Sequence, residues 1–525
     1  MMMKQNVTKQ RLENGLFNYE SFNFFRSMKR SKFLWVCAVA LGFAACTTDE
    51  VPVDVKQHET DTYASVTIKF PGKVTRALPG DYNEQEDTWV GRDKLETVTV
   101  FLVNTAKDVV DYNSFAQSSF EGIDADGVLK PKLALKATSG DNVRVYVVIN
   151  GEASILNTLK ATSADNFATA FAGEAAKIAS QVASYDASDK TEVIMMTNDK
   201  DDYSITVVSG IDEATAKAGT SNHAQVNVER VVARAMLTVV PAGDAWTVKA
   251  VIAGEETPIA TVTGVTYAVG QSNKKFYIMK KADYSTPEDV YSYVPTGTDW
   301  ATTGSGYFDY SGLGDFTEVQ QWTYSATDVA TPLNAEETSK FVLPVTHNVT
   351  ETNLVELRKS YKKGNTTYFE IRAEFEPIGP LADGGTYIPG TDVFWGANDS
   401  KFYSTREAAE AQGQKATKFT DGVMKYILWL NPNSLESTPT DPNPKVSPTV
   451  RNQVYHAHIN AFLRMGLPNN PLNPADPNDE DNPDNPISPY DPLKSDYTYL
   501  SVSVKVLPWT IHSYQISLSD PPTMY

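Results

Sequence analysis

Short apolar segments, separated by turn residues, recur along most of this chain. Segments of this kind are typical of strands, and their close, regular spacing favours β-sandwiches. No alternation of strands with long helices indicates a parallel α/β sheet. The predicted strands cover residues 97–103, 143–149, 204–208, 225–232, 235–240, 275–279 and 367–375. We therefore predict a mainly β protein.

Two segments have a helical period instead. Apolar residues recur at spacings of three, four and seven between residues 164 and 185, which predicts an amphipathic helix packed on a sheet. A second, shorter helix is predicted over residues 406–416. Because 525 residues exceed one ordinary domain, we expect an N-terminal β-sandwich over residues 77–241 and a C-terminal one over residues 242–507.

The segment 28–45 has the pattern of a secretory signal. Basic residues at Lys29, Arg30 and Lys32 precede thirteen uncharged residues. As a helix those thirteen span about 20 Å, which is short of the ~30 Å hydrocarbon core of a bilayer. The segment is therefore predicted to be a signal peptide rather than a membrane anchor or a buried helix.

The residues before Cys46 resemble a lipobox, in which the cysteine is lipidated and becomes the new N-terminus. Residues 1–27 precede a complete signal, so we expect them to be a start-site extension and Met28 to be the true start. Cys37 is the other cysteine of the chain. Two cysteines so close to the start exclude a disulfide scaffold, a cysteine-based zinc site and a cysteine nucleophile in the body.

Residues 46–76 are predicted to form a propeptide that contains the first strand. Val66, Ile68 and Phe70 point to one side of this strand, with polar residues between them. Arg76, followed by Ala77, lies in a loop flanked by proline and glycine and is accessible to an Arg-specific protease. Taken alone, Arg76 is better explained as an ordinary surface arginine.

The C-terminal residues 508–525 contain a similar strand. After Trp509, the apolar residues Tyr514, Ile516 and Leu518 alternate with Ser513, Gln515 and Ser517, as the apolar residues of the first strand alternate with its polar ones. The two ends of the chain therefore look interchangeable as occupants of one groove.

Charge and composition narrow the partners. The net charge of −19 argues against nucleic acid, which needs a basic face, and against simple electrostatic attachment to an anionic membrane. Residues 468–492 hold eight prolines and no lysine or arginine, so we expect an extended, exposed loop. Residues 476–481 only faintly resemble a calcium loop, because the EF-hand glycine is missing.

We find no motif for catalysis. No H-E-x-x-H frame, phosphate-binding loop, dinucleotide fingerprint or nucleophile elbow is present. His456 and His458 share a strand face, but two ligands make a weak metal site, and exposed strand histidines are the simpler interpretation. We predict no enzyme activity, no cofactor and no metal.

Several stretches together resemble the fimbrillin family of Bacteroidales-type (type V) pili, most closely its minor (short) fimbrium shaft subunits. The resemblance covers nearly the whole chain. It rests on residues 228–235, 363–368, 429–433, 447–448, 451–452, 508–514 and the loop 468–492.

The resemblance implies two transthyretin-like β-sandwich domains, with one or two peripheral helices. It also implies export as an outer-membrane lipoprotein through Cys46, and cleavage between Arg76 and Ala77 by an Arg-specific protease. Residues 508–525 would then serve as a donor strand, with Trp509, Tyr514, Ile516 and Leu518 filling the groove of the next copy. Further expected partners are tip and anchor fimbrial proteins and host or bacterial surface receptors.

Two alternatives stay open. In the first alternative the chain is a tip or anchor accessory subunit, although its intact C-terminal strand favours a shaft subunit. In the second it is a surface β-sandwich lipoprotein that binds glycans, which would not need a removable first strand.

Overall fold

The computed structural model describes residues 59–70, 87–89, 91–124, 127–282, 284–287, 306–325, 328, 330–346, 362–430, 449–470 and 472, and the backbone of four short strands between residues 501 and 518. The chain is mainly β, as predicted. The predicted signal peptide and the rest of residues 1–58 lie outside the described residues. No helix in the described ranges is long and apolar enough to cross a membrane.

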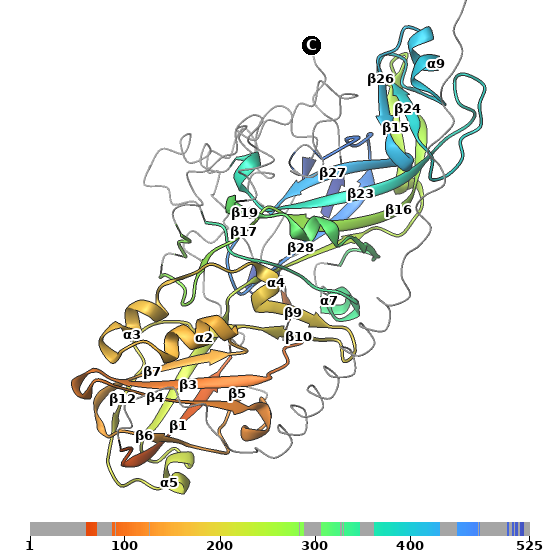
Figure 1. Cartoon of the computed structure of the whole chain (residues 1–525). Helices are drawn as coiled ribbons and strands as arrows, with labels where there is room; N and C mark the ends of the chain where they lie inside the picture. The colour runs from red at the N-terminus through yellow and green to blue at the C-terminus, as the bar shows by residue number, and fades with distance from the viewer. Residues whose placement is uncertain are drawn as a thin grey trace, which may run out of the picture. The chain divides into compact units, whose positions relative to one another are not determined.

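The first sheet is built around the first strand (Figure 1). Its order is β4-β3-β7-β11-β13-β1-β5, with β12 beside β7 and β6 beside β1. Its strands are β1 (Thr62–Lys69), β3 (Thr97–Asn104), β4 (Val109–Ala116), β5 (Val128–Leu129), β6 (Leu135–Ala137), β7 (Gly140–Ile149), β11 (Met196–Asn198), β12 (Ser204–Val207) and β13 (His223–Arg230). Because β1 pairs with β13 on one side and with β5 and β6 on the other, it is an internal strand of this sheet.

Helices α2 (Ala153–Lys160) and α3 (Ala164–Phe171) lie beside β3 and β7 in Figure 1. The rings of Phe167 and Tyr146 are 4.9 Å apart, and Phe167 and Phe101 are 5.0 Å apart. These aromatic contacts attach α3 to the sheet. Sequence reasoning did not find α2.

The predicted single helix over residues 164–185 is wrong. It ends at Phe171, and three short elements follow it: β8 (Glu174–Ala175), α4 (Ala179–Val182) and β9 (Ala183–Asp186). Gly173 is the physical reason, because its N–H donates to the carbonyl of Ala170 and a Cβ at this position would lie only 3.0 Å from that oxygen. The later apolar residues match the helical period but belong to other elements.

The second sheet contains β14, the first strand after the crossing from the first sheet, and the last strands of the chain, β28 to β32. Its order is β2-β31-β28-β14-β21; off this path, β22 pairs with β14, β30 with β28, β32 with β28 and β29, and β29 with β32. Strands β28 and β14 run parallel, as do β28 and β32. The strands are β2 (Asp87–Thr88), β14 (Ala233–Val239), β21 (Gln320–Gln321), β22 (Lys340–Val342), β28 (Gln453–Phe462), β29 (Ser501–Val502), β30 (Leu507–Pro508), β31 (Thr510–His512) and β32 (Gln515–Leu518).

A third sheet packs against the second and completes a sandwich. Leu237, Tyr455 and Ile459 of the second sheet share one buried cluster with Phe369 and Phe375 of the third. The strands of the third sheet are β15 (Thr247–Ile252), β16 (Glu255–Gly270), β20 (Thr317–Glu318), β23 (Tyr368–Pro377) and β27 (Val423–Trp429).

Smaller elements complete the described parts. These are β10 (Thr191–Ile194), which pairs with β9; β17 (Ser272–Asn273) with β19 (Phe308–Asp309); β18 (Phe276–Tyr277) with β8; β24 (Val393–Gly396), β25 (Lys401–Tyr403) and β26 (Ala416–Phe419); and the helices α5 (Glu213–Lys217), α7 (Ala330–Ala335) and α9 (Arg406–Ala411). More helices are therefore present than the one or two predicted. The predicted helix 406–416 stops early, because Gly413 adopts a positive φ of 72°.

The chain changes sheets between β13 and β14. Val231 and Val232 lie at this crossing and are fully buried. We propose the domain boundary here, about ten residues before the predicted position 241.

The first residues of the loop 468–492 are buried and not exposed as predicted. Asn470 donates from Nδ2 to the hydroxyl oxygen of Tyr368 at 3.0 Å and to Oε2 of Glu370 at 2.6 Å. Leu472 packs in a cluster with Tyr368 and Trp429. These partners hold the start of the loop against the third sheet. The candidate calcium residues 476–481 lie outside the described residues.

Candidate functional site

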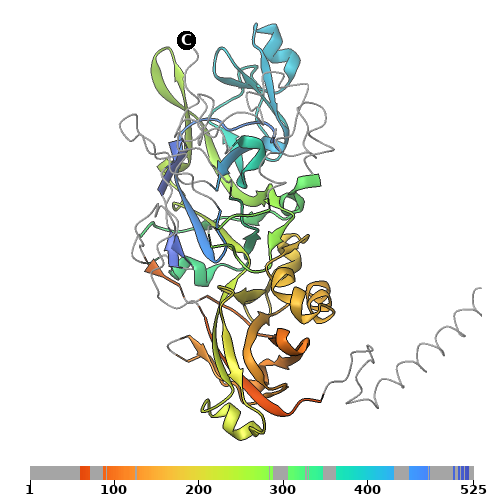
Figure 2. The same cartoon turned by 90° about the vertical axis from the view of Figure 1, so that its left-hand side faces the viewer.

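Strand β1 supplies apolar side chains to the core of the first sheet. Val66, Ile68 and Phe70 are 3%, 0% and 7% exposed, so the predicted inward face is confirmed. Burying three side chains of this size stabilises the fold by about 5–9 kcal/mol. Figure 2 shows β1 in red-orange at the start of the described chain, beside the yellow-green strand β13. We call the surroundings of β1, formed by β5, β6, β13 and α5, the β1 groove.

The backbone of β1 is hydrogen-bonded to several elements of this groove. Ser65 N–H donates to the carbonyl of Asn222 at 2.9 Å, and Phe70 N–H donates to that of Gly127 at 2.8 Å. Asn222, with a left-handed φ of 49°, donates from Nδ2 to the carbonyl of Tyr63 at 2.9 Å. Without a strand in the groove these buried polar groups lose their partners, which is costly.

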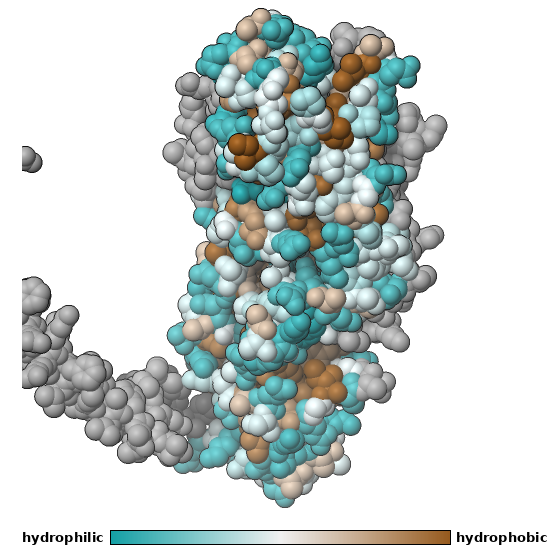
Figure 3. Space-filling model, turned by 90° about the vertical axis from the view of Figure 1, so that its right-hand side faces the viewer, coloured by the Kyte–Doolittle hydropathy of each residue, from teal (hydrophilic) through white to brown (hydrophobic). Residues whose placement is uncertain are grey.

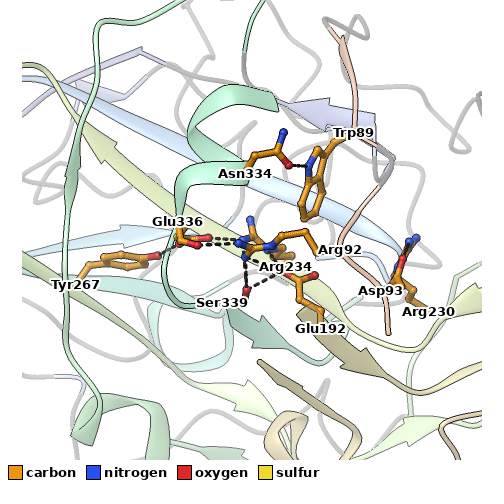
Figure 4. Close-up of polar contacts among 10 residues, drawn as sticks. All are labelled: Trp89, Arg92, Asp93, Glu192, Arg230, Arg234, Tyr267, Asn334, Glu336 and Ser339. Atoms are coloured by element: carbon orange, nitrogen blue, oxygen red, sulfur yellow. Dashed lines mark hydrogen bonds and ion pairs between the residues drawn. The ribbon is translucent and has the colours of Figure 1, made fainter. Parts of the chain in front are cut away.

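The segment that follows β1 in the described chain is fixed separately. We call residues 87–89 and 91–94 the Trp89 segment. The indole N–H of Trp89 donates to Oδ1 of Asn334 at 2.7 Å, and Arg234 Cζ lies 4.9 Å from the ring centroid (Figure 4). Strand β2 in this segment pairs with β31. The Trp89 segment is thus held by contacts to Asn334, Arg234 and β31.

A buried charge cluster underlies Trp89. Figure 4 shows Arg234 of β14 between two carboxylates, those of Glu192 and Glu336. Oε1 of Glu192 accepts hydrogen bonds from Arg234 Nε at 3.0 Å, Arg92 Nη2 at 3.1 Å and the Ser339 hydroxyl at 2.6 Å. The Tyr267 hydroxyl donates to Oε1 of Glu336 at 2.7 Å. We call these six residues the Arg234 cluster.

The two carboxylates of the cluster differ in pKa. Burial raises the pKa of Glu336 above its usual range, and Arg234 only partly opposes this. Burial also acts on Glu192, but Arg234, Ser339 and Arg92 together hold its pKa below the usual range. The difference follows from the hydrogen bonds, since one oxygen of Glu192 accepts three. These buried ion pairs indicate a structural cluster. Through Glu192 and Glu336, Arg234 joins β10 of the N-terminal half to the C-terminal half.

A second buried arginine also links the two halves. Arg451 donates from Nε to the carbonyl of Arg230 at 3.0 Å, from Nη1 to the carbonyl of Tyr277 at 3.1 Å, and from Nη2 to the Thr197 hydroxyl at 3.2 Å. Burial lowers the pKa of Arg451 to about 10. The guanidinium thus bonds neutral oxygens of residues that precede and follow the sheet crossing.

His456 and His458 are buried and not exposed as predicted. Both contact the Thr238 hydroxyl oxygen, His456 through Nε2 at 2.7 Å and His458 through Nδ1 at 2.8 Å. The ring of Trp322 covers both, with centroids 5.7 and 5.8 Å away. Sequence alternation could not reveal this cover, because Trp322 is distant in the chain. In the described ranges, no group of three His, Cys, Asp or Glu residues could hold a metal.

These histidines predict a pH dependence. Burial lowers the pKa of His458 from 6.5 to about 4 and that of His456 well below 6.5, so the unfolded chain binds protons more readily. Their contribution to stability is complete above pH 6.5 and is lost as the pH falls towards 4. At pH 5 the lowered pKa of His458 costs about 2 kcal/mol of stability. In urea titrations at pH 7 and pH 5, His458→Gln should lose less stability between the two pH values than the parent does. An equal loss would contradict the assignment.

The remaining predicted site residues are those of the lipidation site, the cleavage site and the donor strand. Cys46, Arg76, Ala77, Trp509 and Tyr514 lie outside the described residues. Ile516 and Leu518 are described by their backbone alone.

That backbone forms β32, in which Ile516 pairs with Ile459 and Leu518 with Phe462 of the same chain. Sequence reasoning missed the Trp89 segment and the Arg234 cluster. One signal was available, since Arg234 interrupts an apolar run from residue 231 to 236, and a charge buried in a strand needs a partner.

Comparison with known proteins gives a consistent result. The family model described as "Major fimbrial subunit protein type IV, Fimbrillin, C-terminal" matches residues 417–515. Two curated proteins called "Minor fimbrium subunit Mfa1" from Porphyromonas gingivalis are each 31% identical, over 531 and 529 residues. Each alignment covers 93% of this chain and 100% of the relative.

Solved structures of fimbrial proteins are more distant. A fimbrilin (fimA) from Porphyromonas gingivalis W83 is 13% identical with a TM-score of 0.38, covering 89% of this chain and 100% of that one. The tip fimbrial protein Mfa3 from Porphyromonas gingivalis is 9% identical with a TM-score of 0.34, covering 76% and 94%. Because these TM-scores are below 0.5, the family of the chain is assigned from the sequence relatives alone.

These matches define a class, the structural subunits of cell-surface fimbriae. Because the identity of 31% extends over nearly the whole length, the chain belongs to the minor fimbrium subunit (Mfa1) family.

Proposed function

We propose that this fimbrial subunit is a shaft pilin that polymerises by protease-triggered donor-strand exchange and supports adhesion. The single observation that carries the proposal is β1. This strand supplies a fully buried Ile68 to a sheet core, yet it lies on the N-terminal side of Arg76 in the sequence.

A cut between Arg76 and Ala77 would separate β1 from the body of the protein. The groove would then hold unpaired backbone groups and exposed apolar walls, which favours capture of another strand. Residues 513–518 of a second copy provide apolar side chains at alternate positions. Because each copy then gives a strand at one end and accepts one at the other, the contact does not close and a filament results.

The Trp89 segment supports this proposal. A new N-terminus at Ala77 would be followed closely by Trp89, which is held by Asn334 and Arg234. The body would therefore keep its N-terminal segment in place when β1 leaves.

Export and partners complete the proposal. Lipidated Cys46 would hold the precursor at the outer membrane, and the same cut would release the body from that anchor. Expected partners are further copies of the chain, tip and anchor fimbrial proteins, the Arg-specific protease and surface receptors.

A gel experiment tests assembly. Purified precursor is treated with an Arg-specific protease and run unboiled beside the untreated precursor. We expect a ladder of oligomers from the treated sample, and no ladder when residues 508–525 are deleted. A stable monomer as the only product of cleavage at Arg76 would rule out the shaft role.

A further inference from the structure

One imidazole contacts two polar side chains of β1. The Ser65 hydroxyl oxygen is 2.7 Å from Nδ1 of His223, and the Thr67 hydroxyl oxygen is 3.1 Å from Nε2 of the same ring. The Ser65 hydroxyl also donates to the carbonyl of Ala216 at 2.6 Å. Ser65 is 1% exposed, and Thr67 and His223 are partly buried.

The hydrogen-bond partners determine where the hydroxyl proton of Ser65 points and which nitrogen of His223 is protonated. A carbonyl oxygen only accepts, so the single hydroxyl proton of Ser65 goes to Ala216. Nδ1 of His223 must then carry a proton and donate it to Ser65. In the neutral ring Nε2 is unprotonated and accepts from Thr67. The ring therefore requires a hydroxyl at the first position and a donor two residues later.

These contacts define one register of the strand. Ser65 pairs with His223 and Thr67 with Gln225 in the parallel ladder of β1 and β13. A slip of one residue would turn apolar side chains towards the imidazole and polar ones into the core. The apolar face alone penalises odd slips. A slip of two residues keeps the apolar face inward, so the apolar core does not penalise it. His223 does, because a slip of two places different side chains against its ring nitrogens.

The tail of the chain matches this requirement. Residues 65–70 are Ser-Val-Thr-Ile-Lys-Phe, and residues 513–518 are Ser-Tyr-Gln-Ile-Ser-Leu. Without a gap, serine stands at the first position of both and isoleucine at the fourth. Gln515 takes the place of Thr67, and its amide can donate to Nε2.

We propose that His223 sets the register of strand exchange, by binding Ser513 and Gln515 of a second copy of this chain in the β1 groove. The inference rests on the proposed function and adds a specificity-determining residue to it. The remaining walls of the groove contribute affinity, whereas His223 selects where along the tail the groove binds.

A single-step assembly of two full-length chains tests this. The donor carries Arg76→Ala, so its own β1 stays attached and its groove stays filled. The acceptor is cleaved and carries Ile516→Asp, so it cannot donate. The heterodimer is quantified on unboiled gels as a function of donor concentration.

We expect His223→Ala in the acceptor to weaken heterodimer formation about tenfold, and a donor with Ser513→Ala and Gln515→Ala to weaken it about tenfold as well. Combined, the two should give little further loss, because they remove the same contacts. Acceptor His223→Gln, which keeps a donor and an acceptor, should recover most of the binding. Donor Ser517→Ala, matched to Lys69, should leave binding unchanged.

The outcomes separate the two proposals. If no heterodimer forms with His223 intact, donor-strand exchange itself is wrong. If it forms and His223→Ala has no effect, or its effect multiplies with that of the donor variant to about a hundredfold, the role of His223 is overturned. Urea unfolding of the uncleaved His223→Ala chain shows whether it is folded, and an unfolded variant would leave the decision to His223→Gln with the two donors.

Discussion

Arg234→Ala is expected to destabilise the folded chain by about 3–5 kcal/mol, because it leaves two carboxylates in a buried site without the cation between them. Arg234 is fully buried, Glu192 is fully buried, and Glu336 is 7% exposed. Arg92 still contacts Glu192 in the variant, which limits but does not remove the penalty. The free energy of unfolding in urea measures the effect.

A matched control comes from the same region. Lys190 and Glu337 form an ion pair at 3.3 Å, but their side chains are 57% and 82% exposed. Lys190→Ala should leave stability almost unchanged, because exposed pairs contribute little. The double variant Arg234→Met with Glu336→Gln should recover much of the loss, since it removes the charge of Glu336 and leaves Glu192 paired with Arg92. If Arg234→Ala is as stable as the parent, the cluster does not hold the two halves together.

The stability of this cluster bears on assembly. Arg234 lies on β14, Glu192 on β10, and Trp89 stacks over Arg234. Loss of Arg234 should therefore also loosen the Trp89 segment, which lies between β1 and β3 in the sequence and pairs with β31. On the face drawn in Figure 3, teal and white residues dominate, and the brown residues form separate groups.

Local patterns in the sequence predicted the strands well. Short apolar segments between turn residues identified β7, β12 and β13, and alternation identified β1, because a strand with one buried face imposes a period of two on its own residues. The inward face of β1 followed from the same rule. The resemblance of the two ends of the chain also needed no structure, since both are short stretches that can be compared directly.

Contacts between distant residues were not accessible in this way. The carboxylates of Glu192 and Glu336 bind one guanidinium although 144 positions separate them, the difference between 336 and 192. In a chain with 65 acidic residues, no pattern singles out this pair. The predicted exposure of the histidines on β28 was wrong for the same reason, because Trp322, which covers them, comes from a different part of the chain. The prediction of one helix over residues 164–185 was wrong because it relied on the helical period and did not take Gly173 into account.

Ile516→Asp is expected to abolish assembly while leaving the monomer folded. In the ungapped match of the two ends, residue 516 takes the position of Ile68, which is fully buried in the β1 groove. A carboxylate there loses the apolar burial of isoleucine, about 1.5–3 kcal/mol, and adds the larger cost of a buried, unpaired charge. The ladder seen on unboiled gels after Arg-specific cleavage should therefore be absent.

Ser517→Asp is the matched control, because it adds the same charge one residue away. Position 517 corresponds to Lys69, which is only partly buried, so the ladder should persist. Mixing gives a sharper result. Cleaved Ile516→Asp chains keep an open groove and can accept a parent tail, but they cannot donate one onwards. Added to the parent, they should shorten its polymers in proportion to their fraction, since each one ends a filament. Unchanged polymer length in the mixture, or a full ladder from Ile516→Asp alone, would mean that the subunits are joined by some other surface.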